Sequence, residues 1–588
     1  MSILNWLTEL MGEQFNQIGL DASYGAVVKS DRPDLAQFQC NGALAAAKAA
    51  KQKPRDLALS ITERLESMEH FSEVTIAGPG FINLKLKDSV LLHWIEKVNR
   101  DDRLGCPAAD PSEMIIVDYG GANVAKPMHV GHLRAAIIGE SIKRQAQFLG
   151  HQVVGDVHLG DWGLQMGMLI AEMAERTPEL PYFDPDFSGP YPGESPVTID
   201  ELAEIYPTAS GKAKEDIGML HRSRQATQEL QDGRPGYMAL WQHFVDVSVA
   251  ELKVDYARLN VYFDLWLGES DTQPVLPDMI AHLQEAGHVR ESDDALIIDV
   301  VKPDDNHELP PLILRKSDGA VLYGSTDLAT ILMRVRDYKP ERVVYVVDRR
   351  QSDHFAQVFR AAYKTNIAPD SMELTHVDFG TMNGKDGRPF KTREGGALRL
   401  SNLLEMVYDA ARQKLDEVEV GGDLDGEEKE SVAKLVGVAA LKFADLSNHR
   451  SKNYVFELDK FFSFEGRTGP YLLYTTVRAK SLLGRANAAG ATLGTIGKPA
   501  SDLERNLLLS FLDLPEVLNK AFADYAPHHL CEYAYTLATQ FNRFYHEHHI
   551  MTEADLEQQG AWLALTDLFV RMEEQVLTLL GIEVPEKM

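Results

Sequence analysis

Cysteine is scarce in this sequence of 588 residues. Only three cysteines occur, at Cys40, Cys106 and Cys531. They lie too far apart for a CxxC zinc pair, and they are too few for a disulfide framework. This scarcity suits a reducing compartment, and we therefore expect a cytoplasmic protein.

Positive charge is also in short supply. The chain has 59 Lys and Arg against 88 Asp and Glu, which gives a formal net charge of -29. This balance excludes a protein that holds nucleic acid through an overall basic surface, because such binding neutralises phosphates with many Lys and Arg side chains. Any contact with RNA must therefore be local.

Long apolar runs are missing too, so we expect no membrane partner. The first residues, MSILNWLTELMGEQF, are amphipathic and acidic, and they lack the basic start of a secretory signal. Hydrophobic residues make up 44% of the chain and charged residues 25%, as in ordinary globular proteins. A chain of this length predicts about two to four folded domains.

The first part of the chain, residues 1–108, mixes two kinds of pattern. Leu57, Ile61 and Leu65 repeat at helical spacing, whereas VTIAGPGFINLKLK reads as two strands joined by a GPG turn. We predict a small α+β domain that ends in the linker DDRLGCPAADPSE.

The middle part, residues 109–425, repeats the order strand, helix, strand. MIIVDY is a short apolar run, Ile138, Ile142 and Ala146 follow at helical spacing, and HQVVGDVH completes the first unit. ERVVYVVDRRQSDHFAQVFRAAY and THVDFG form a second unit. We predict a Rossmann-type doubly wound sheet, interrupted by an insertion over about residues 172–310.

The last part, residues 426–588, follows the acidic and Gly-rich stretch DEVEVGGDLDGEEKE. Strand patterns disappear after this stretch. Successive amphipathic runs such as SVAKLVGVAALKFADL and ALTDLFVRMEEQVLTLLG predict an all-helical bundle.

The segment ANVAKPMHVGH places two histidines where the first strand of the sheet meets its helix. Open α/β sheets bind ligands at the carboxyl ends of their strands. Gly131 allows a ligand to approach the backbone closely, and the helix N-terminus favours an anion. We predict that His129 and His132 bind a nucleotide phosphate and donate hydrogen bonds as charge develops at phosphorus.

Two other interpretations of the histidine pair stay open at this point. His129 and His132 also suit a turn with helix capping, and the tetrapeptide HVGH alone favours that interpretation. A metal site is the third interpretation. It requires a further ligand, and the positive charge of the neighbouring Lys126 would repel a cation.

Longer segments carry a resemblance to a known family. VDYGGANVAKPMHVGHLRAAIIGE resembles the HIGH region of class I aminoacyl-tRNA synthetases, and specifically that of arginyl-tRNA synthetases. Before it, RPDLAQFQCNGALAAAK and GPGFINLKL also match. The resemblance continues, in order, through LGDWGLQMGMLI, YARLNVYFD, PLILRKSDGAVLYGSTDLA, GRPFKTREGG, ADLSNHRSKNYVFELDKFFSFEGRTGPYLLY and LLGIEVPEKM. It covers practically the whole chain.

The resemblance implies an enzyme that makes arginyl-AMP and pyrophosphate from arginine and ATP, and then transfers arginine to the 3′ end of tRNA(Arg). It also implies that the first step depends on bound tRNA. Mg²⁺ would accompany ATP, whereas no tightly bound cofactor and no resident metal are expected. Because there is one substrate RNA, we expect a monomer to be sufficient.

The resemblance also assigns an arginine site. The matching positions are Asp118, Gly121, Asn123, Tyr323, Asp327 and Gln351. The carboxylates of Asp118 and Asp327 suit a guanidinium, and the amides of Asn123 and Gln351 suit the amino and carboxyl groups of the substrate. Without the resemblance, Asp327 is equally well explained as a helix N-cap and Tyr323 as a buried strand aromatic.

Positions for tRNA follow from the same resemblance. In residues 1–108, Phe81 and Asn83 match contacts to the tRNA elbow, where an aromatic ring stacks on a base and an amide reads its edge. In the helical bundle, Tyr545 and Met588 match contacts to the anticodon. Without the resemblance, Tyr545 would be taken for a core residue.

Two departures from the family pattern bear on the site. Relatives often have Ser-Pro where this chain has Gly121-Ala122, so the loop loses a hydroxyl donor and arginine affinity becomes uncertain. The second class I element, KMSKS, is represented only by PFKTR. Lys391 and Arg393 are its predicted ATP-binding residues, and its second lysine position holds Thr392.

We predict that Lys126 supplies the cation that Thr392 does not. It lies three residues before His129, and Pro127 stiffens its approach to the phosphates. The alternative is a solvated loop lysine, which is the usual fate of such residues.

Two rival functions compete with that of an active synthetase. One is a catalytically weak paralogue that binds tRNA or partners, and the intact HVGH and helical bundle count against it. The other is a free-standing nucleotidyltransferase with an HxGH site, which would not need two flanking domains.

Overall fold

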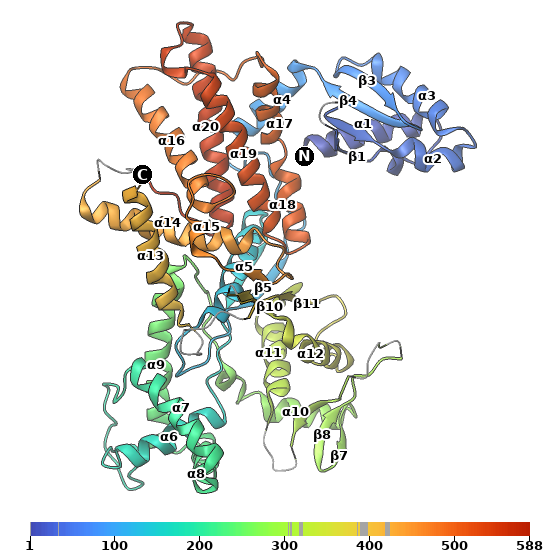
Figure 1. Ribbon diagram of the computed structural model, residues 1–588. Helices are drawn as coiled ribbons and strands as arrows, with labels where there is room; N and C mark the ends of the chain where they lie inside the picture. The colour runs from blue at the N-terminus through green and yellow to red at the C-terminus, as the bar shows by residue number, and fades with distance from the viewer. Residues whose placement is uncertain are drawn as a thin grey trace.

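The computed structural model describes residues 2–32, 35–303, 305, 309–316, 321–384, 386–388, 398–417 and 424–588. Figure 1 shows a small N-terminal unit at one corner, a central sheet, a helical unit below the sheet and long helices from the end of the chain above it. Within the described ranges, no helix is both long and apolar enough to cross a membrane.

The N-terminal unit is an antiparallel sheet of strand order β1-β2-β4-β3, against which three helices pack. Its turn between β3 and β4 uses the predicted glycines, since Gly78 and Gly80 have φ values of +52° and +151°. The elements are α1 (Ile3–Gln17), η1 (Ala22–Gly25), β1 (Val27–Lys29), β2 (Phe38–Cys40), α2 (Gly42–Ala50), α3 (Pro54–Glu66), β3 (Phe71–Ala77), β4 (Phe81–Leu86) and the connecting helix α4 (Asp88–Arg100).

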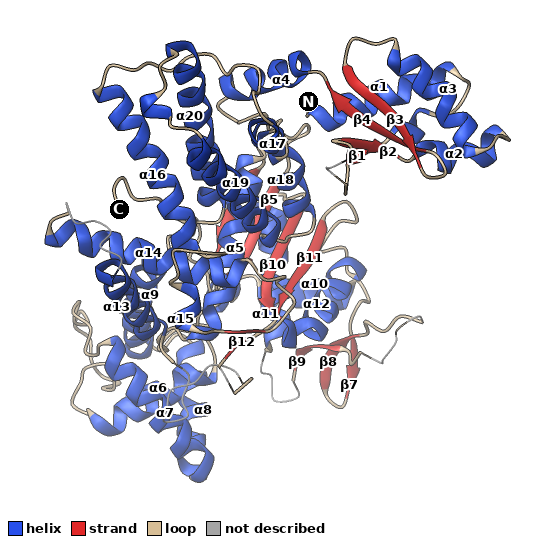
Figure 2. Ribbon diagram, turned by 45° about the horizontal axis from the view of Figure 1, so that its top comes forward, coloured by secondary structure: helices blue, strands red, loops and turns tan. Residues whose placement is uncertain are grey.

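The central sheet is parallel and has the strand order β11-β10-β5-β6 (Figure 2). The chain leaves β5 for β6 on one side and leaves β10 for β11 on the other. The crevice between the carboxyl ends of β5 and β10 is therefore the topological switch point, where ligands bind in such sheets. The elements are β5 (Met114–Tyr119), α5 (Val130–Phe148), β6 (Gln152–Asp156), α11 (Tyr323–Asp337), β10 (Arg342–Asp348), η3 (Arg349–Gln351), α12 (Ser352–Lys364) and β11 (Glu373–Phe379).

The predicted insertion, residues 172–310, contains two separate structures. A helical unit with its own apolar core starts earlier than predicted, at Leu164, and a small antiparallel sheet ends later, at Arg315. The elements are α6 (Leu164–Arg176), α7 (Ile199–Glu215), α8 (Ile217–Gln231), α9 (Pro235–Arg258), η2 (Glu269–Thr272), α10 (Leu276–Glu285), β7 (Arg290–Ser292), β8 (Ala295–Ile298) and β9 (Leu312–Arg315).

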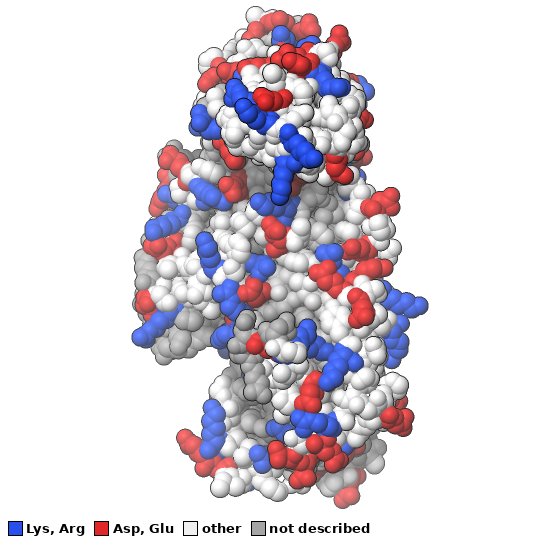
Figure 3. Space-filling model, turned by 90° about the vertical axis from the view of Figure 1, so that its right-hand side faces the viewer, with Lys and Arg blue, Asp and Glu red and all other residues white. Residues whose placement is uncertain are grey.

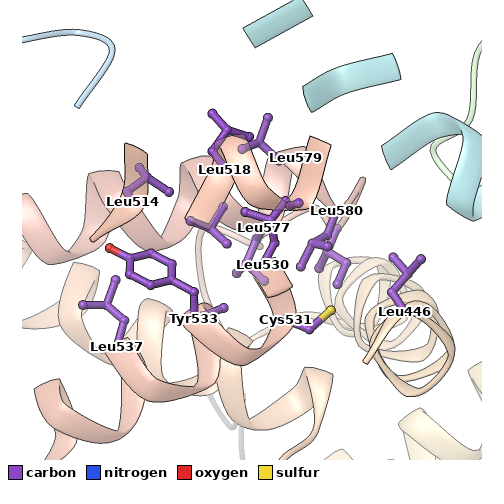
Figure 4. Packing of buried hydrophobic residues seen from close by; sticks show 14 of the residues in the cluster. Leu446, Leu514, Leu518, Leu530, Cys531, Tyr533, Leu537, Leu577, Leu579 and Leu580 are labelled. Carbon is purple, nitrogen blue, oxygen red and sulfur yellow. The ribbon is translucent and has the colours of Figure 1, made fainter. Parts of the chain in front are cut away.

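The end of the chain forms the predicted bundle, whose leucine-rich packing appears in Figure 4. Its helices are α13 (Leu400–Glu417), α14 (Gly426–Leu446), α15 (Leu458–Phe461), α16 (Gly469–Ala488), α17 (Asp502–Phe511), α18 (Leu514–Ala523), α19 (His528–Glu547), η4 (Ile550–Thr552) and α20 (Leu556–Leu579). The predicted fold class, a doubly wound sheet with an α+β unit and a helical bundle, is confirmed.

One detail of that prediction is wrong, because strands do not disappear after residue 426. The short strand β13 (Tyr454–Val455) pairs in parallel with β12 (Met382–Asn383). These two-residue strands form where the chain returns from α14 to the end of the central sheet. They have no periodic sequence pattern, because their pairing depends on a contact between distant segments.

Helix α5 joins the sheet to the bundle through buried polar groups. The hydroxyl of Tyr119, on β5, donates to Glu140 Oε2 at 2.6 Å, and Ser141 Oγ donates to the Leu579 carbonyl at 2.9 Å. Gly139 makes this approach possible, because a Cβ at that position would overlap the Tyr119 side chain. The position of α5 is therefore fixed by both neighbours.

We predict that Gly139→Ala lowers the melting temperature. Overpacking of this kind costs about 1–3 kcal/mol, since Tyr119 or the helix must shift. Gly484→Ala is the matched control within a helix, because a Cβ there meets nothing within 4 Å. Calorimetry should show the control unchanged or stabilised by up to about 1 kcal/mol. Equal melting temperatures for Gly139→Ala and wild type would contradict the packing argument.

Candidate active site

A cavity of about 460 Å³ opens at the switch point between β5 and β10. Side chains from α5, α11 and α12 and from the loop after β5 form its walls. The structure brings together most of the residues predicted from the sequence. The cavity is lined by Asp118, Gly121, Asn123, His129, Gly131, His132, Tyr323, Asp327 and Gln351, among others.

The two histidines cap the N-terminus of α5. His129 is the N-cap residue, and its Nδ1 accepts a hydrogen bond from the Gly131 amide at 3.0 Å. His132 Nδ1 accepts from the His129 amide at 3.1 Å, and the two rings stack with their centroids 4.0 Å apart. A Cβ on Gly131 would lie 2.7 Å from His129 Cε1, so the glycine makes room for the ring.

Capping also makes Nε2 the hydrogen-bond donor of both imidazole rings. Because each Nδ1 accepts a backbone hydrogen, each neutral imidazole carries its proton on Nε2. Burial, followed by the charge of Lys126, lowers the pKa of His129, and burial together with His129 lowers that of His132 to about 3. Both rings are therefore neutral at physiological pH. The capping and phosphate-binding interpretations are compatible, since they use different nitrogens.

The loop between β5 and α5 is held by backbone contacts. Gly120 and Gly121 have φ values of +96° and +55°, which favour glycine. The Val124 amide donates to the Gly160 carbonyl at 2.9 Å, and a Cβ on Gly160 would overlap the Asn123 side chain. The loop that carries Gly121 is thus tied to the residues after β6.

The opposite wall is acidic, and its first acid is paired inside the protein. Arg334 Nη2, on α11, lies 2.5 Å from Asp118 Oδ2 and 2.6 Å from Asp156 Oδ2. Burial raises the pKa of Asp118, and the charge of Arg334 opposes this effect. The guanidinium of Arg334 therefore offsets much of the negative charge of Asp118.

The second acid, Asp327, lies within α11 and contacts α12. Its Oδ2 accepts a hydrogen bond from His354 Nε2 at 2.5 Å. The N-cap of α11 is Leu322, so the alternative of Asp327 as a helix cap is wrong. Tyr323 is the first residue of that helix and is 51% exposed, so the alternative of a buried strand aromatic is also wrong.

Glu269 is an acid that sequence reasoning missed. It lines the same cavity from η2, which backbone pairing places there: the Glu269 amide donates to the Leu159 carbonyl at 3.0 Å. Burial, followed by the carboxylates of Asp161 and Asp327, raises the pKa of Glu269 from its usual 4.5 to about 8. No pattern in the sequence marks Glu269, because more than a hundred residues separate it from the loop after β5.

Family models match this chain from one end to the other. Residues 95–458 match "tRNA synthetases class I (R), catalytic domain", residues 472–588 match "DALR anticodon binding domain", and residues 6–86 match "Arginyl tRNA synthetase N terminal domain". An arginine–tRNA ligase of Alkaliphilus oremlandii is 52% identical over 587 residues, with both chains fully covered. The chain belongs to the arginyl-tRNA synthetase family.

Other relatives agree with this family assignment, and the resemblance seen in the sequence is confirmed. An arginine–tRNA ligase of Agathobacter rectalis is 48% identical over 594 residues, again with both chains fully covered. The crystal structure of the arginyl-tRNA synthetase of Plasmodium falciparum superimposes with a TM-score of 0.82 at 24% identity. That superposition covers 100% of this chain and 99% of the other, and it supports the fold.

Lys126 lies near the histidines of this synthetase but not among the residues that line the cavity. Its Nζ is 4.3 Å from the centre of the Tyr206 ring, on α7. Its charge nevertheless lowers the pKa of both His129 and His132. The other predicted ATP-binding residues, Lys391 and Arg393, lie outside the described residues.

The predicted tRNA-binding residues of the synthetase lie far from the cavity along the chain. Phe81 is half-buried at the start of β4, whereas Asn83 is buried and its Oδ1 accepts from Gln39 Nε2 at 2.9 Å. Tyr545, on α19, is half-buried with the Arg478 guanidinium 4.5 Å from its ring centre. Met588 packs against the bundle. Their contacts with RNA stay predictions.

We predict that Glu269→Gln changes how stability depends on pH. A carboxyl group whose pKa is raised by folding destabilises the native state progressively as the pH rises from 4.5 to about 8, the unfolded and folded values. Glutamine does not ionise, so the variant does not lose stability in this way. The melting temperature of the variant relative to wild type should therefore rise across this window and level off above it.

Glu285→Gln is the control, because Glu285 is exposed at the end of α10. Its melting temperature should follow wild type at every pH. Parallel curves for Glu269→Gln and wild type would show that Glu269 is not protonated in the empty cavity.

Proposed function

We propose that this chain activates L-arginine with ATP and transfers it to the 3′ end of tRNA(Arg). The observation that carries the proposal is the division of one cavity into two chemically opposite walls. Neutral imidazoles and a helix N-terminus suit the phosphates of ATP on one wall, and carboxyl groups suit a guanidinium on the other. The full-length family match supports the same conclusion.

In the first step, a carboxylate oxygen of arginine attacks the α-phosphorus of ATP. The bond to pyrophosphate breaks, and arginyl-AMP forms. The Nε2 hydrogens of His129 and His132 donate to phosphate oxygens as negative charge develops there, and Gly131 leaves room at the helix N-terminus. The reaction needs no general base at this step, because the attacking carboxylate is already ionised.

Arginine is bound across the two walls. Asp327 accepts from the guanidinium, with Tyr323 beside it, while Asn123 and Gln351 bind the amino and carboxyl groups. Asp118 contributes less charge than the sequence suggested, because Arg334 already pairs with it. Gly121 lets the backbone of the loop approach the substrate.

ATP enters as its magnesium complex. Among the residues that the structure describes, no three metal-ligating side chains gather in one place. The phosphate oxygens and water would therefore supply most of the ligands of Mg²⁺, and Lys391 and Arg393 are proposed to contact ATP.

In the second step, a hydroxyl of the terminal ribose of the tRNA attacks the arginyl carbonyl, and AMP leaves. We assign residues 1–108 to the tRNA elbow through Phe81 and Asn83, residues 109–425 to catalysis, and residues 426–588 to the anticodon through Tyr545 and Met588. On the face of the molecule shown in Figure 3, Lys and Arg side chains lie in small groups among acidic side chains. This distribution suits contacts with RNA that are local.

We further propose that the enzyme acts as a cytoplasmic monomer. A charging assay with all twenty amino acids and purified tRNA tests the function. Arginine alone should be attached to tRNA(Arg). Binding of tRNA without charging would favour a weak paralogue, and nucleotidyl transfer without tRNA would favour a free-standing nucleotidyltransferase.

We predict that Asp327→Asn raises the arginine KM and weakens the discrimination against citrulline. The change converts a charge-assisted hydrogen bond of about 1.5–3 kcal/mol into a neutral one. Asp337→Asn, at the exposed end of the same helix, is the control. Steady-state arginylation measures both variants, and unchanged arginine kinetics would remove Asp327 from the site.

We predict that Lys126→Ala lowers kcat for arginyl-AMP formation by roughly 10²–10³, the scale of losing one preorganised donor. The long stem of Lys126 would carry its charge from Tyr206 to the phosphates. Lys253→Ala is the matched control, because Lys253 Nζ also lies over an aromatic ring, 5.1 Å from the centre of Trp266. Pyrophosphate exchange in the presence of tRNA is the measurement.

Two further results would define the role of Lys126. Arginine binding and melting temperature should stay near wild type, and Thr392→Lys should restore part of the rate in Lys126→Ala. Pyrophosphate exchange by Lys126→Ala at the wild-type rate would show that Lys126 has no role in this step.

A further inference from the structure

Four side chains meet where the first turns of α11 and α12 face each other at the cavity. Tyr323 and Asp327 are spaced i, i+4 on α11, and Gln351 and His354 are spaced i, i+3 at the start of α12. These spacings place each pair on one helix face. Three of the four residues have proposed contacts with arginine, and His354 has no assigned role.

We infer that His354 is a positioning residue that fixes the carboxylate of Asp327 for the guanidinium of arginine. The inference rests on the proposed function, which assigns Asp327 to the substrate. It concerns how the protein sets the direction of that carboxylate. His354 itself need not touch the guanidinium.

The contact between the two side chains is short and directional. His354 Nε2 donates to Asp327 Oδ2, and the two atoms are 2.5 Å apart. Both side chains are about one-fifth exposed, at 20% and 22%, so the bond lies at the cavity wall. Because the protein holds Oδ2, rotation of the Asp327 carboxylate about its Cβ–Cγ bond is restricted. Oδ1 stays available to a ligand.

Aromatic packing fixes the imidazole of His354 in turn. Its ring lies 5.2 Å from the ring of Tyr323 and 5.5 Å from that of Phe355, measured between centroids. Phe355 is buried, and His376 stacks on it at 4.8 Å. The donor to Asp327 is therefore supported by aromatic rings from both helices, as a preorganised site requires.

A nearby acid explains why Asp327 needs this support. Glu269 lines the same cavity, and the charge of Asp327 contributes to its raised pKa. Like charges in one cavity repel each other. The hydrogen bond from His354 holds the Asp327 carboxylate in place against this repulsion. Without His354, the Asp327 carboxylate would be able to turn away from Glu269.

Two other roles for His354 fit the structure less well. A metal ligand is not supported, because the described residues contain no group of three metal-ligating side chains. A general base is not required, because the attacking carboxylate of arginine is already ionised in the first step. The short bond to Asp327 also occupies Nε2.

The test uses His354→Leu and His354→Gln in pyrophosphate exchange with saturating tRNA. Leucine removes the donor, so the arginine KM should rise about 10- to 100-fold, the loss expected for a hydrogen bond to a charged group. The ATP KM and kcat should change less than about 3-fold. Glutamine keeps an N–H donor of similar reach, and its arginine KM should recover to within about 5-fold of wild type.

His376→Leu is the matched control, because it removes a second imidazole that packs on Phe355 and does not bond Asp327. Its arginine KM should stay at the wild-type value. Circular dichroism and melting temperature are measured for all variants. An equal rise in the arginine KM for His376→Leu would indicate a general packing effect and would overturn the inference.

The double variant His354→Leu/Asp327→Asn shows whether the two residues act together. If His354 acts through Asp327, His354→Leu should add less than about 3-fold to the arginine KM of Asp327→Asn. A full additional effect in the double variant would overturn the inference. An arginine KM unchanged in His354→Leu alone would also overturn it.

The same experiment separates this inference from the proposed arginine site. If Asp327→Asn raises the arginine KM but His354→Leu does not, only the role of His354 is lost. If Asp327→Asn itself leaves the arginine KM unchanged, the assignment of Asp327 to the substrate fails, and the role of His354 fails with it.

Discussion

Helix α5 is the element on which the arrangement of the site depends, because it presents both histidines and is held by buried polar contacts at several levels. Arg134 Nε lies 2.9 Å from Asp445 Oδ2 of the bundle, and both side chains are almost fully buried. Further along, Glu140 binds Tyr119 of the sheet and Ser141 binds the end of α20. Loss of one partner would leave the other buried and unpaired, which is costly. The bundle therefore helps to fix the position of the cavity wall that carries His129 and His132.

Arg334 performs the corresponding task on the acidic wall. It reaches Asp118 on β5 and Asp156 on β6, at the carboxyl ends of two neighbouring parallel strands. Two buried carboxylates on neighbouring strands would repel each other. The guanidinium of Arg334 lies between them and pairs with both. Its position also means that a buried arginine side chain of the protein lies behind Asp118, near the place proposed for the substrate. Asp327, two turns earlier on the same face of α11, is left as the acid whose partner is a histidine.

Much of this fold could be predicted from the sequence, because it rests on local pattern. The apolar run of β5, the helical spacing of α5 and the glycines of the β3–β4 turn all appear in short windows. Residues that reach the site through distant pairing had no such signal, as Glu269 and Arg334 show. His354 is an intermediate case, since it lies in the first turn of α12, three residues after the N-cap Gln351. The contact with Asp327 required the placement of α11 against α12.

Burial shifts the pKa values of groups on the two walls of the cavity in opposite directions. Burial disfavours charge, so it lowers the pKa of the imidazoles of His129 and His132 and raises that of Glu269. Two acids of the cavity have partners within the protein, since Asp118 pairs with Arg334 and Asp327 accepts a hydrogen bond from His354. The substrates would bring charge to both walls. The negative phosphates of ATP would meet neutral donors on one wall, and the positive guanidinium of arginine would meet carboxyl groups on the other. A neutral analogue of arginine would bring no charge to the acidic wall. It would therefore gain little from the direction in which His354 holds Asp327.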